Sequence, residues 1–421
     1  MNAVDIENKV KSQALAAKAA ARQLRSASTT EKNTALLAMA NALGHSSDKI
    51  LAANAADIAA AKAKGISSAL IDRLTLNEER LSAAAHGLRE VAALPDPVGA
   101  TVSMTRRPNG LEVGRIRVPL GVVGIIYEAR PNVTVDAAGL CLKAGNAVIL
   151  RGGSEAFRSN MAIVEAMNAA LERTGLPPAS VQAIRDTDRA ATLALMRQTG
   201  LVDVLIPRGG RGLIRTVLEN ATVPIIETGE GNCHIFVDES APLDAASRIV
   251  LNAKCQRPGV CNAVETLLIH QGIADRFLPA IAASLAERNV HSRGCERSRE
   301  IVPELEAAQE ADWETEYLDL VLAIKVVDSL AEAIDHIDKY GTGHSEAILT
   351  NDYNNAREFL EKVDSAAVYV NASTRFTDGH QFGLGAEMGI STQKLHARGP
   401  MGLEELTSTK FVIYGSGQTR T

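Results

Sequence analysis

Residues 119–132 read Pro119-Leu-Gly-Val-Val-Gly-Ile-Ile-Tyr127-Glu-Ala-Arg-Pro-Asn132, an apolar run followed by a polar one. The run Val122–Tyr127 predicts a strand buried on both faces, as strands of parallel sheets are. A helix is expected to follow over residues 133–144. Asn132 therefore stands between strand and helix, where its side chain either caps the helix or donates a hydrogen bond to a ligand.

The alternation of apolar strands and helices continues to about residue 240. Further strands are predicted at Ala147–Arg151, Val181–Ile184, Val202–Ile206, Val223–Ile226 and His234–Val237. Helical stretches lie between them, near 155–174, 187–199 and 211–220. This order predicts a parallel, doubly wound sheet. A second round of strands and helices, from 265 to 371, predicts a second α/β domain that begins near Cys255.

The flanking segments have other patterns. Residues 4–93 are Ala-rich and predict helices, and two pairs, Ser28 with Glu31 and Thr75 with Glu78, have capping-box spacing. The Asn109-Gly110 pair predicts a hairpin within 102–118. Lys410–Tyr414 predicts an edge strand near the C-terminus.

Composition is that of a globular protein. Of 421 residues, 46% are hydrophobic and 22% charged, and the net charge of −6 predicts neither a nucleic-acid nor a membrane-surface partner. Charged residues interrupt the Ala-rich N-terminus, which predicts an amphipathic helix and no signal peptide. No apolar run reaches the roughly 18 residues that span a bilayer. The five cysteines lack disulfide or metal-ligand spacing, so no metal is expected, and a reducing cytoplasm is the expected location.

A candidate nucleophile lies in residues 254–263, Lys-Cys-Gln-Arg-Pro-Gly-Val-Cys-Asn-Ala. Cys261 follows a Pro-Gly turn, just after the helix expected to end near Lys254. A thiolate held on such a turn faces a cleft and can attack a carbonyl carbon. The alternative is that Cys261 is a small buried hydrophobe, as most cysteines without a disulfide are.

Two clusters at predicted strand ends are candidate cofactor contacts, because ligands of open α/β sheets bind beyond the carboxyl ends of the strands. In Arg208–Gly212, Gly209 and Gly210 allow backbone N–H groups to approach a phosphate at a helix N-terminus; the alternative is a solvated turn. In Arg151–Glu155, Arg151 and Ser154 favour a 2′-phosphate, and hence NADP over NAD. The alternative there is an ordinary turn in which Ser154 caps the next helix.

The segments 119–132 and Leu142–Leu150 resemble the cofactor domain of the aldehyde dehydrogenase superfamily. Residues 327–348, with Tyr-Gly-Thr-Gly-His-Ser-Glu, resemble the signature of its gamma-glutamyl phosphate reductase family, also called glutamate-5-semialdehyde dehydrogenases. The similarity covers residues 10–414. It implies an aldehyde-dehydrogenase-like α/β fold of two doubly wound domains plus a small β oligomerisation hairpin. The implied division is a cofactor-binding domain (1–101 and 119–254), a catalytic domain (255–400) and oligomerisation elements (102–118 with 401–421).

The resemblance also implies roles for individual residues. Cys261 matches the nucleophile and Asn132 the oxyanion donor. Arg151, Ser154, Gly209 and Gly210 fall on the adenosine and pyrophosphate side of the cofactor, and Glu316 matches the glutamate that holds the nicotinamide ribose. Glu227 stands where the superfamily's general base stands, but the segment after it departs from the superfamily pattern. A reductase that releases its acyl group by hydride transfer needs no such base.

The implied reaction is NADPH-dependent reduction of L-glutamyl 5-phosphate to L-glutamate 5-semialdehyde and phosphate through a cysteine thioester, the second step of proline biosynthesis from glutamate. Substrate contacts are expected from Arg257, Arg375 and His344, whereas His336 is expected to be structural. A hydrolytic aldehyde dehydrogenase that uses Glu227 is the alternative enzyme, and an inactive scaffold is the alternative outside catalysis. A homo-oligomer is expected, with glutamate 5-kinase as a further candidate partner.

Overall fold

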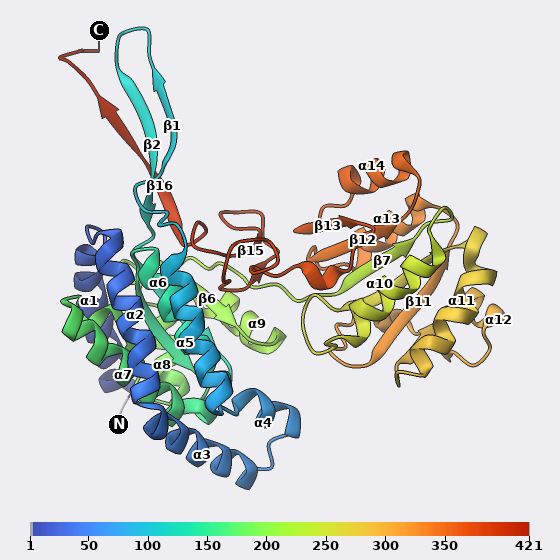
Figure 1. The fold of residues 1–421 in the computed structure, drawn as a ribbon, viewed down its shortest axis with the longest axis horizontal. Helices are drawn as coiled ribbons and strands as arrows, with labels where there is room; N and C mark the ends of the chain where they lie inside the picture. The colour runs from blue at the N-terminus through green and yellow to red at the C-terminus, as the bar shows by residue number, and fades with distance from the viewer. Residues whose placement is uncertain (1–2, 421) are drawn as a thin grey trace. The chain divides into compact units, whose positions relative to one another are not determined.

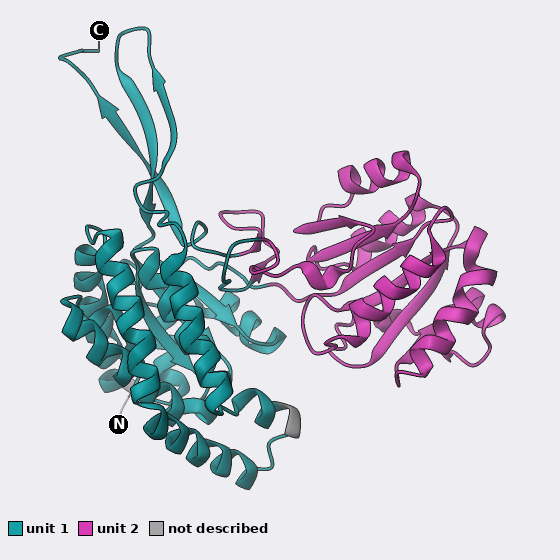
Figure 2. Cartoon of the chain, viewed as in Figure 1, with its two compact units in different colours: residues 1–228, 383–389, 401–421 teal, residues 229–382, 390–400 magenta. Residues whose placement is uncertain are grey.

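The chain forms two compact units in the computed structural model, which describes residues 3–420 without the side chains at positions 68 and 69. Unit 1 comprises residues 1–228, 383–389 and 401–421, and unit 2 comprises 229–382 and 390–400 (Figure 2). Residues 1, 2 and 421 of the expected domains lie outside the described residues. No helix of the described part is long and apolar enough to cross a membrane.

Unit 1 is built on a parallel sheet of four strands in the order β5-β4-β3-β6. Its strands are β3 (Val122–Tyr127), β4 (Ala147–Gly152), β5 (Val181–Ala183) and β6 (Val204–Arg208). Its crossover helices are α6 (Pro131–Lys143), α7 (Phe157–Thr174), α8 (Arg189–Met196) and α9 (Arg211–Asn220). All six residues of β3 are buried, as its unbroken apolar run predicts.

The N-terminal segment forms five helices that pack on this unit (Figure 1). They are α1 (Ala3–Leu24), α2 (Thr29–His45), α3 (Ser47–Ala63), α4 (Ser68–Leu74) and α5 (Glu78–Ala93). The capping box of Ser28 and Glu31 is confirmed at the start of α2. The one expected at Thr75 is wrong, because Asn77 caps α5 by accepting a hydrogen bond from the Arg80 N–H, and Thr75 ends α4.

The predicted hairpin and C-terminal strand form one antiparallel sheet, in the order β1-β2-β16. The strands β1 (Thr101–Arg106) and β2 (Glu112–Pro119) flank the turn at Asn109-Gly110, and β16 (Thr407–Tyr414) pairs with β2 along its whole length. Figure 1 shows this sheet extending away from the helices of unit 1. Apolar side chains on it are exposed, among them Met104, Phe411, Ile413 and Tyr414.

Unit 2 contains a parallel sheet of seven strands in the order β10-β9-β11-β8-β7-β12-β13. The strands are β7 (Cys233–Val237), β8 (Val264–His270), β9 (His291–Gly294), β10 (Glu306–Ala307), β11 (Val321–Val327), β12 (Ser345–Leu349) and β13 (Ala367–Val370). The helices are α10 (Leu243–Cys255), α11 (Gln271–Ala286), α12 (Glu296–Ile301), α13 (Leu330–Tyr340) and α14 (Tyr353–Lys362). A short antiparallel pair joins β14 (Ile390–Ser391) to β15 (Gly399–Pro400).

Two expectations about the strands are wrong. The strand at 233–237 belongs to the second sheet, where it pairs with β8 and β12, and it lies in the compact unit that begins at residue 229. Residues 223–226 form no strand beyond a single bridge from Ile225 to Leu205. Both errors have one cause: an apolar run reports burial, whereas the pairing partner depends on the rest of the sheet.

His336 lies in α13 and is 3% exposed, packed edge-on against Trp313 and His234. This agrees with the structural role expected for it. Burial, with the nearby charges of His234, Lys325 and Lys339, lowers the pKa of His336 to about 2. The folded state therefore favours the neutral ring.

A depressed histidine pKa makes stability depend on pH in one direction. The contribution of His336 is complete above its unfolded pKa near 6.5 and is lost as the pH falls from there towards 2. We expect His336 to account for about 2 kcal/mol of the stability lost between neutral pH and about pH 5. Urea unfolding of wild type and His336→Phe at both pH values measures this, and equal acid losses in the two proteins would contradict it.

Candidate active site

The loop that carries Cys261 is held between α10 and β8. The helix ends at Cys255, close to the expected position, and β8 begins at Val264. Gly231 lies directly against the loop, since a Cβ at that position would stand 1.5 Å from the Cys261 carbonyl oxygen. Only glycine fits there, and Cys261 remains partly exposed. Cys261 is therefore not the fully buried core thiol that the sequence left as an alternative.

Side chains from distant segments tie this loop in place. Asn262 Nδ2 donates to the Thr377 carbonyl at 2.8 Å, and the Thr374 hydroxyl donates to the Asn262 carbonyl at 2.7 Å. Arg375 donates to Asn262 Oδ1 and, through Nε at 2.8 Å, to Gln256 Oε1. Arg375 thus bridges both ends of the nucleophile loop, a role that was not expected from the sequence.

Two arginines bring positive charge to the loop, Arg257 within it and Arg375 hydrogen-bonded to it. Burial and the charge of Arg257 lower the pKa of the Arg375 guanidinium, whereas Cys261 and Asp378 act in the opposite direction. Arg257 itself is exposed. The two arginines and Cys261 therefore share one electrostatic environment, which suits both a thiolate and an anionic leaving group.

Glu316 lies on the same edge of unit 2. Its Oε1 accepts a hydrogen bond of 2.8 Å from the N–H of Gly231, the glycine that touches the Cys261 carbonyl. The segment that carries Glu316 is fixed to β8, because Glu265 Oε1 accepts a hydrogen bond from the Leu318 N–H at 3.2 Å. Glu265 in turn forms a fully buried ion pair with Lys254, at 2.5 Å.

This ion pair was not anticipated from the sequence, although one signal was there to be read. Lys254 and Glu265 are charged residues inside otherwise apolar helix and strand patterns, and buried charges in such places need a partner. Burial raises the pKa of Glu265 to about 7 despite the attraction of Lys254. The pair connects the helix before Cys261 with the strand after it.

Removing one partner of the pair is expected to be costly. Lys254→Met leaves the Glu265 carboxyl buried without its cation, and we expect a loss of about 3–5 kcal/mol in the free energy of unfolding. The double variant Lys254→Met/Glu265→Leu is the matched control, since it removes both charges and should recover most of the loss. Chemical denaturation of the three proteins decides this, and a single variant as stable as wild type would refute it.

The candidate residues of unit 2 gather at the amino ends of its strands, opposite to the edge expected for open α/β sheets. Gly231, Cys261 and Glu316 precede β7, β8 and β11, and His344 precedes β12. His344 is completely buried, so its expected contact with substrate is corrected to a place behind the nucleophile. There its Nδ1 lies 2.8 Å from the Ser345 hydroxyl and 3.6 Å from the Cys233 thiol.

In unit 1, the candidate residues follow strands at their carboxyl ends, as expected. Asn132 is exposed in the first turn of α6, after Pro131. The helix cap is Arg130, so Asn132 does not act as the N-cap that the sequence left open. Its amide donates to the Asp136 carboxylate at 3.5 Å. The geometry leaves this amide accessible to a ligand.

Arg151 and Ser154 follow β4 but differ in accessibility. Arg151 is 9% exposed and donates to the carbonyls of Gly152 and Thr187, while its Nε is buried without a protein acceptor. Burial lowers the pKa of Arg151, and Asp186 and Glu155 oppose that effect. Ser154 is exposed and opens a short 3-10 helix instead of capping α7, so its hydroxyl is accessible.

The glycine pair before α9 carries a feature that the sequence did not reveal. The Gly210 N–H donates to Glu128 Oε1 at 3.2 Å, and a Cβ at Gly209 would stand 2.7 Å from the Glu128 carboxyl carbon. A carboxylate therefore occupies the start of the helix, where an anion is favoured. The backbone cradle expected for a phosphate is present, and an acidic side chain of the same unit lies in it.

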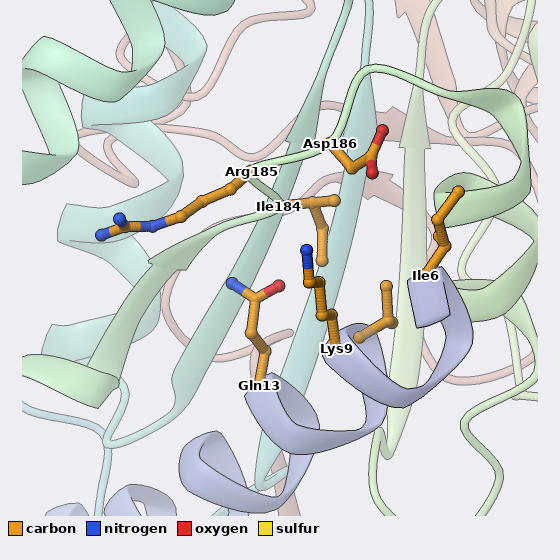
Figure 3. Close-up of a pocket in the computed structure, with 7 residues that line it drawn as sticks. Ile6, Lys9, Gln13, Ile184, Arg185 and Asp186 are labelled. Carbon is orange, nitrogen blue, oxygen red and sulfur yellow. The ribbon is translucent and has the colours of Figure 1, made fainter. Parts of the chain in front are cut away.

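Two cavities lie apart from these residues. One of about 90 Å³ lies beside α1, whose Lys9 and Gln13 extend towards the segment from Ile184 to Asp186 (Figure 3). Another, of about 440 Å³, lies at the carboxyl ends of strands in unit 2 and is lined by residues that include Asp238 and His270. No group of histidine, cysteine and acidic residues within 3–420 is arranged to hold a metal ion.

Comparisons with known proteins agree with the fold. The model of the aldehyde dehydrogenase family matches residues 4–319 and 309–412. A gamma-glutamyl phosphate reductase of Moorella thermoacetica is 66% identical over 404 residues, which make up 96% of this chain and 97% of that protein. One from Carboxydothermus hydrogenoformans is 63% identical over the same shares of both chains.

Solved structures give the same result. A gamma-glutamyl phosphate reductase of Thermotoga maritima is 52% identical, with a TM-score of 0.96, over 98% of this chain and 100% of that one. The Saccharomyces cerevisiae enzyme of that name is 31% identical, with a TM-score of 0.55, over 97% of this chain and 98% of that one. The expected fold class and family resemblance are confirmed.

Proposed function

Because the chain belongs to the aldehyde dehydrogenase family, and within it to the gamma-glutamyl phosphate reductases, we propose that it reduces L-glutamyl 5-phosphate to L-glutamate 5-semialdehyde and phosphate. This is the second step of proline biosynthesis from glutamate. The observation that carries the proposal is the nucleophile loop, in which Cys261 is partly exposed beside Arg257 and Arg375 in a chain 66% identical to a named reductase.

The chain's own residues divide the work between an acyl transfer and its electrostatics. The Cys261 thiolate attacks the acyl phosphate carbon, the C–O bond to phosphate breaks, and a thioester remains on sulfur. Arg257 stabilises the departing phosphate, a role supported by its exposed position in the loop, and Arg375 fixes that loop. Asn132 donates its amide to the oxyanion of the tetrahedral intermediate. Because the thioester is released by hydride transfer and not by hydrolysis, Glu227 is not needed to activate a water molecule.

The cofactor we propose is NADP(H), which supplies the hydride that reduces the thioester; the family as a whole uses a nicotinamide cofactor. Residues of unit 1 fit the phosphates of such a group, and one residue of unit 2 fits a ribose. The Gly209–Gly210 backbone and the accessible Ser154 suit phosphates. Three positions before Ser154, the buried Arg151 has an Nε that donates to no protein acceptor. Glu316 suits a ribose hydroxyl.

Glu128 is expected to weaken cofactor binding. Its carboxylate accepts from the Gly210 N–H, so a bound pyrophosphate has to displace or neutralise it. Glu128→Gln removes the negative charge, and we expect NADPH to bind about three- to fivefold more tightly, the size of a charge effect at a helix N-terminus. Titration of NADPH fluorescence measures the affinity. Glu219→Gln, which removes a charge paired with Arg215 near the other end of α9, is the control, and an unchanged affinity in Glu128→Gln would contradict the expectation.

The reverse reaction tests the proposed function directly. NADP reduction is followed by absorbance with glutamate 5-semialdehyde as substrate, with phosphate present or omitted. A reductase releases its acyl group to phosphate, so turnover should require phosphate. If turnover is equal without phosphate, water is the acceptor, Glu227 becomes the candidate base, and the hydrolytic dehydrogenase replaces the reductase.

Three further parts of the proposal concern partners and compartment. The sheet of β1, β2 and β16 exposes apolar side chains in the described structure, and we assign it to contacts between copies of this chain. Glutamate 5-kinase is a candidate partner, because it supplies the reactive acyl phosphate. A reducing cytoplasm suits a thiol nucleophile in a chain whose five cysteines form no disulfide.

A further inference from the structure

A series of buried, hydrogen-bonded polar side chains within unit 2 leads from the Cys261 carbonyl into the core. The Cys233 thiol donates to the Cys261 carbonyl at 3.1 Å and lies 3.6 Å from His344 Nδ1. His344 Nδ1 contacts the Ser345 hydroxyl at 2.8 Å, which contacts the Thr377 hydroxyl at 2.7 Å. These four side chains are 0% exposed.

This series of buried polar groups also contacts the loop at Asn262, the residue after the nucleophile. The backbone carbonyl of Thr377 accepts a hydrogen bond from the side-chain amide of Asn262. The peptide group that joins Cys261 to Asn262 is therefore held at its oxygen by Cys233 and beyond it by Thr377. Because these contacts join residues at the start of β7, before β12 and after β13, they fix the loop relative to the sheet.

The protonation states favour this arrangement. Burial raises the pKa of the Cys233 thiol well above its ordinary value, so it stays protonated and keeps its donor. Burial lowers the pKa of His344 to about 4, so its ring is neutral near pH 7. A neutral thiol and a neutral ring need no counter-ion in the core. The β7–β8 ladder also shifts register at Cys233, as irregularities that aim a side chain do.

We propose that Cys233 and His344 are positioning residues, which hold the peptide after Cys261 so that its thiolate is presented in a reactive geometry. Neither touches the substrate. The inference rests on the proposed function only in naming Cys261 as the nucleophile. A misplacement of the nucleophile by about 1 Å costs up to about 100-fold in rate. The effect on turnover should therefore exceed the effect on substrate binding.

The test uses the full-length protein and two pairs of variants. Cys233→Ala removes the donor and Cys233→Ser keeps one; His344→Leu removes Nδ1 and His344→Asn places a polar atom near it. We expect Cys233→Ala and His344→Leu to lower kcat about tenfold or more with KM changed less than about threefold. The conservative variants should restore most of kcat.

Hydrogen exchange separates positioning from general stability and requires no substrate. The Ala263 N–H donates to the Val260 carbonyl at 3.0 Å within the loop and reports on its order. In Cys233→Ala, exchange should rise about tenfold in a peptide covering 256–263 and stay unchanged in one covering β11. Cys141→Ala, which removes an equally buried thiol from α6 of unit 1, should change neither kcat nor this exchange.

Two results would overturn the inference. One is a Cys233→Ala protein that is less stable throughout but has wild-type kcat and no selective exchange in the loop. The other is a loss confined to KM. If Cys233→Ala does not fold, the His344 pair decides. Failure of the proposed reaction leaves the exchange result standing, so the two failures are distinguishable.

Discussion

Replacing Cys261 by serine is expected to lower kcat by at least about 1,000-fold. A serine hydroxyl that has no general base beside it is a far weaker nucleophile than a thiolate. The fold should be unaffected, since Cys261 is partly exposed and the loop is held by hydrogen bonds of Asn262 and Cys233. Steady-state rates with glutamate 5-semialdehyde, NADP and phosphate measure the loss.

A second cysteine provides the matched control. Cys255 is the last residue of α10 and lies six positions before Cys261, and burial raises the pKa of its thiol. Cys255→Ser should keep nearly all activity. Incubation with the acyl phosphate in the absence of NADPH, followed by mass spectrometry, should place the acyl group on Cys261. Full turnover in Cys261→Ser would remove the covalent mechanism altogether.

The second large effect is expected at Asn132. Loss of one oxyanion donor costs about 2.7–4 kcal/mol of transition-state stabilisation, or about 100- to 1,000-fold in kcat. Asn132→Ala should therefore lower kcat by that factor with little change in KM, since the charge on oxygen develops only in the transition state. The stability of the variant should be close to that of wild type, because Arg130 and not Asn132 caps α6.

Asn220→Ala is the control for this substitution. Asn220 is the last residue of α9 in the same unit, and its amide donates to the Thr216 carbonyl within its own helix. It should retain wild-type kinetics. A loss in Asn132→Ala that appears in KM rather than in kcat would assign the amide to ground-state binding, and no loss would exclude it from the site.

Much of the fold followed from local pattern. The run Val122–Tyr127 corresponds to β3 without a change of bounds, and α9 begins and ends at the predicted residues 211 and 220. The short elements β9 and α12 were missed, because four to six residues are too few for a period to show. Cys261 and Asn132 were found by their place after a turn and after a strand, and the family comparison confirmed the class of enzyme without testing their roles.

The sequence by itself determined the order of the longer strands and helices, the hairpin at Asn109-Gly110 and the turn that carries Cys261, because each depends on neighbours a few residues away. Only the tertiary structure decided that β7 joins the second sheet, that Lys254 meets Glu265, and that Cys233 and His344 stand behind the nucleophile. These contacts depend on strand pairing and on buried polar groups, which bring together residues as far apart as Cys233 and His344, 111 positions, and no local period encodes such pairs.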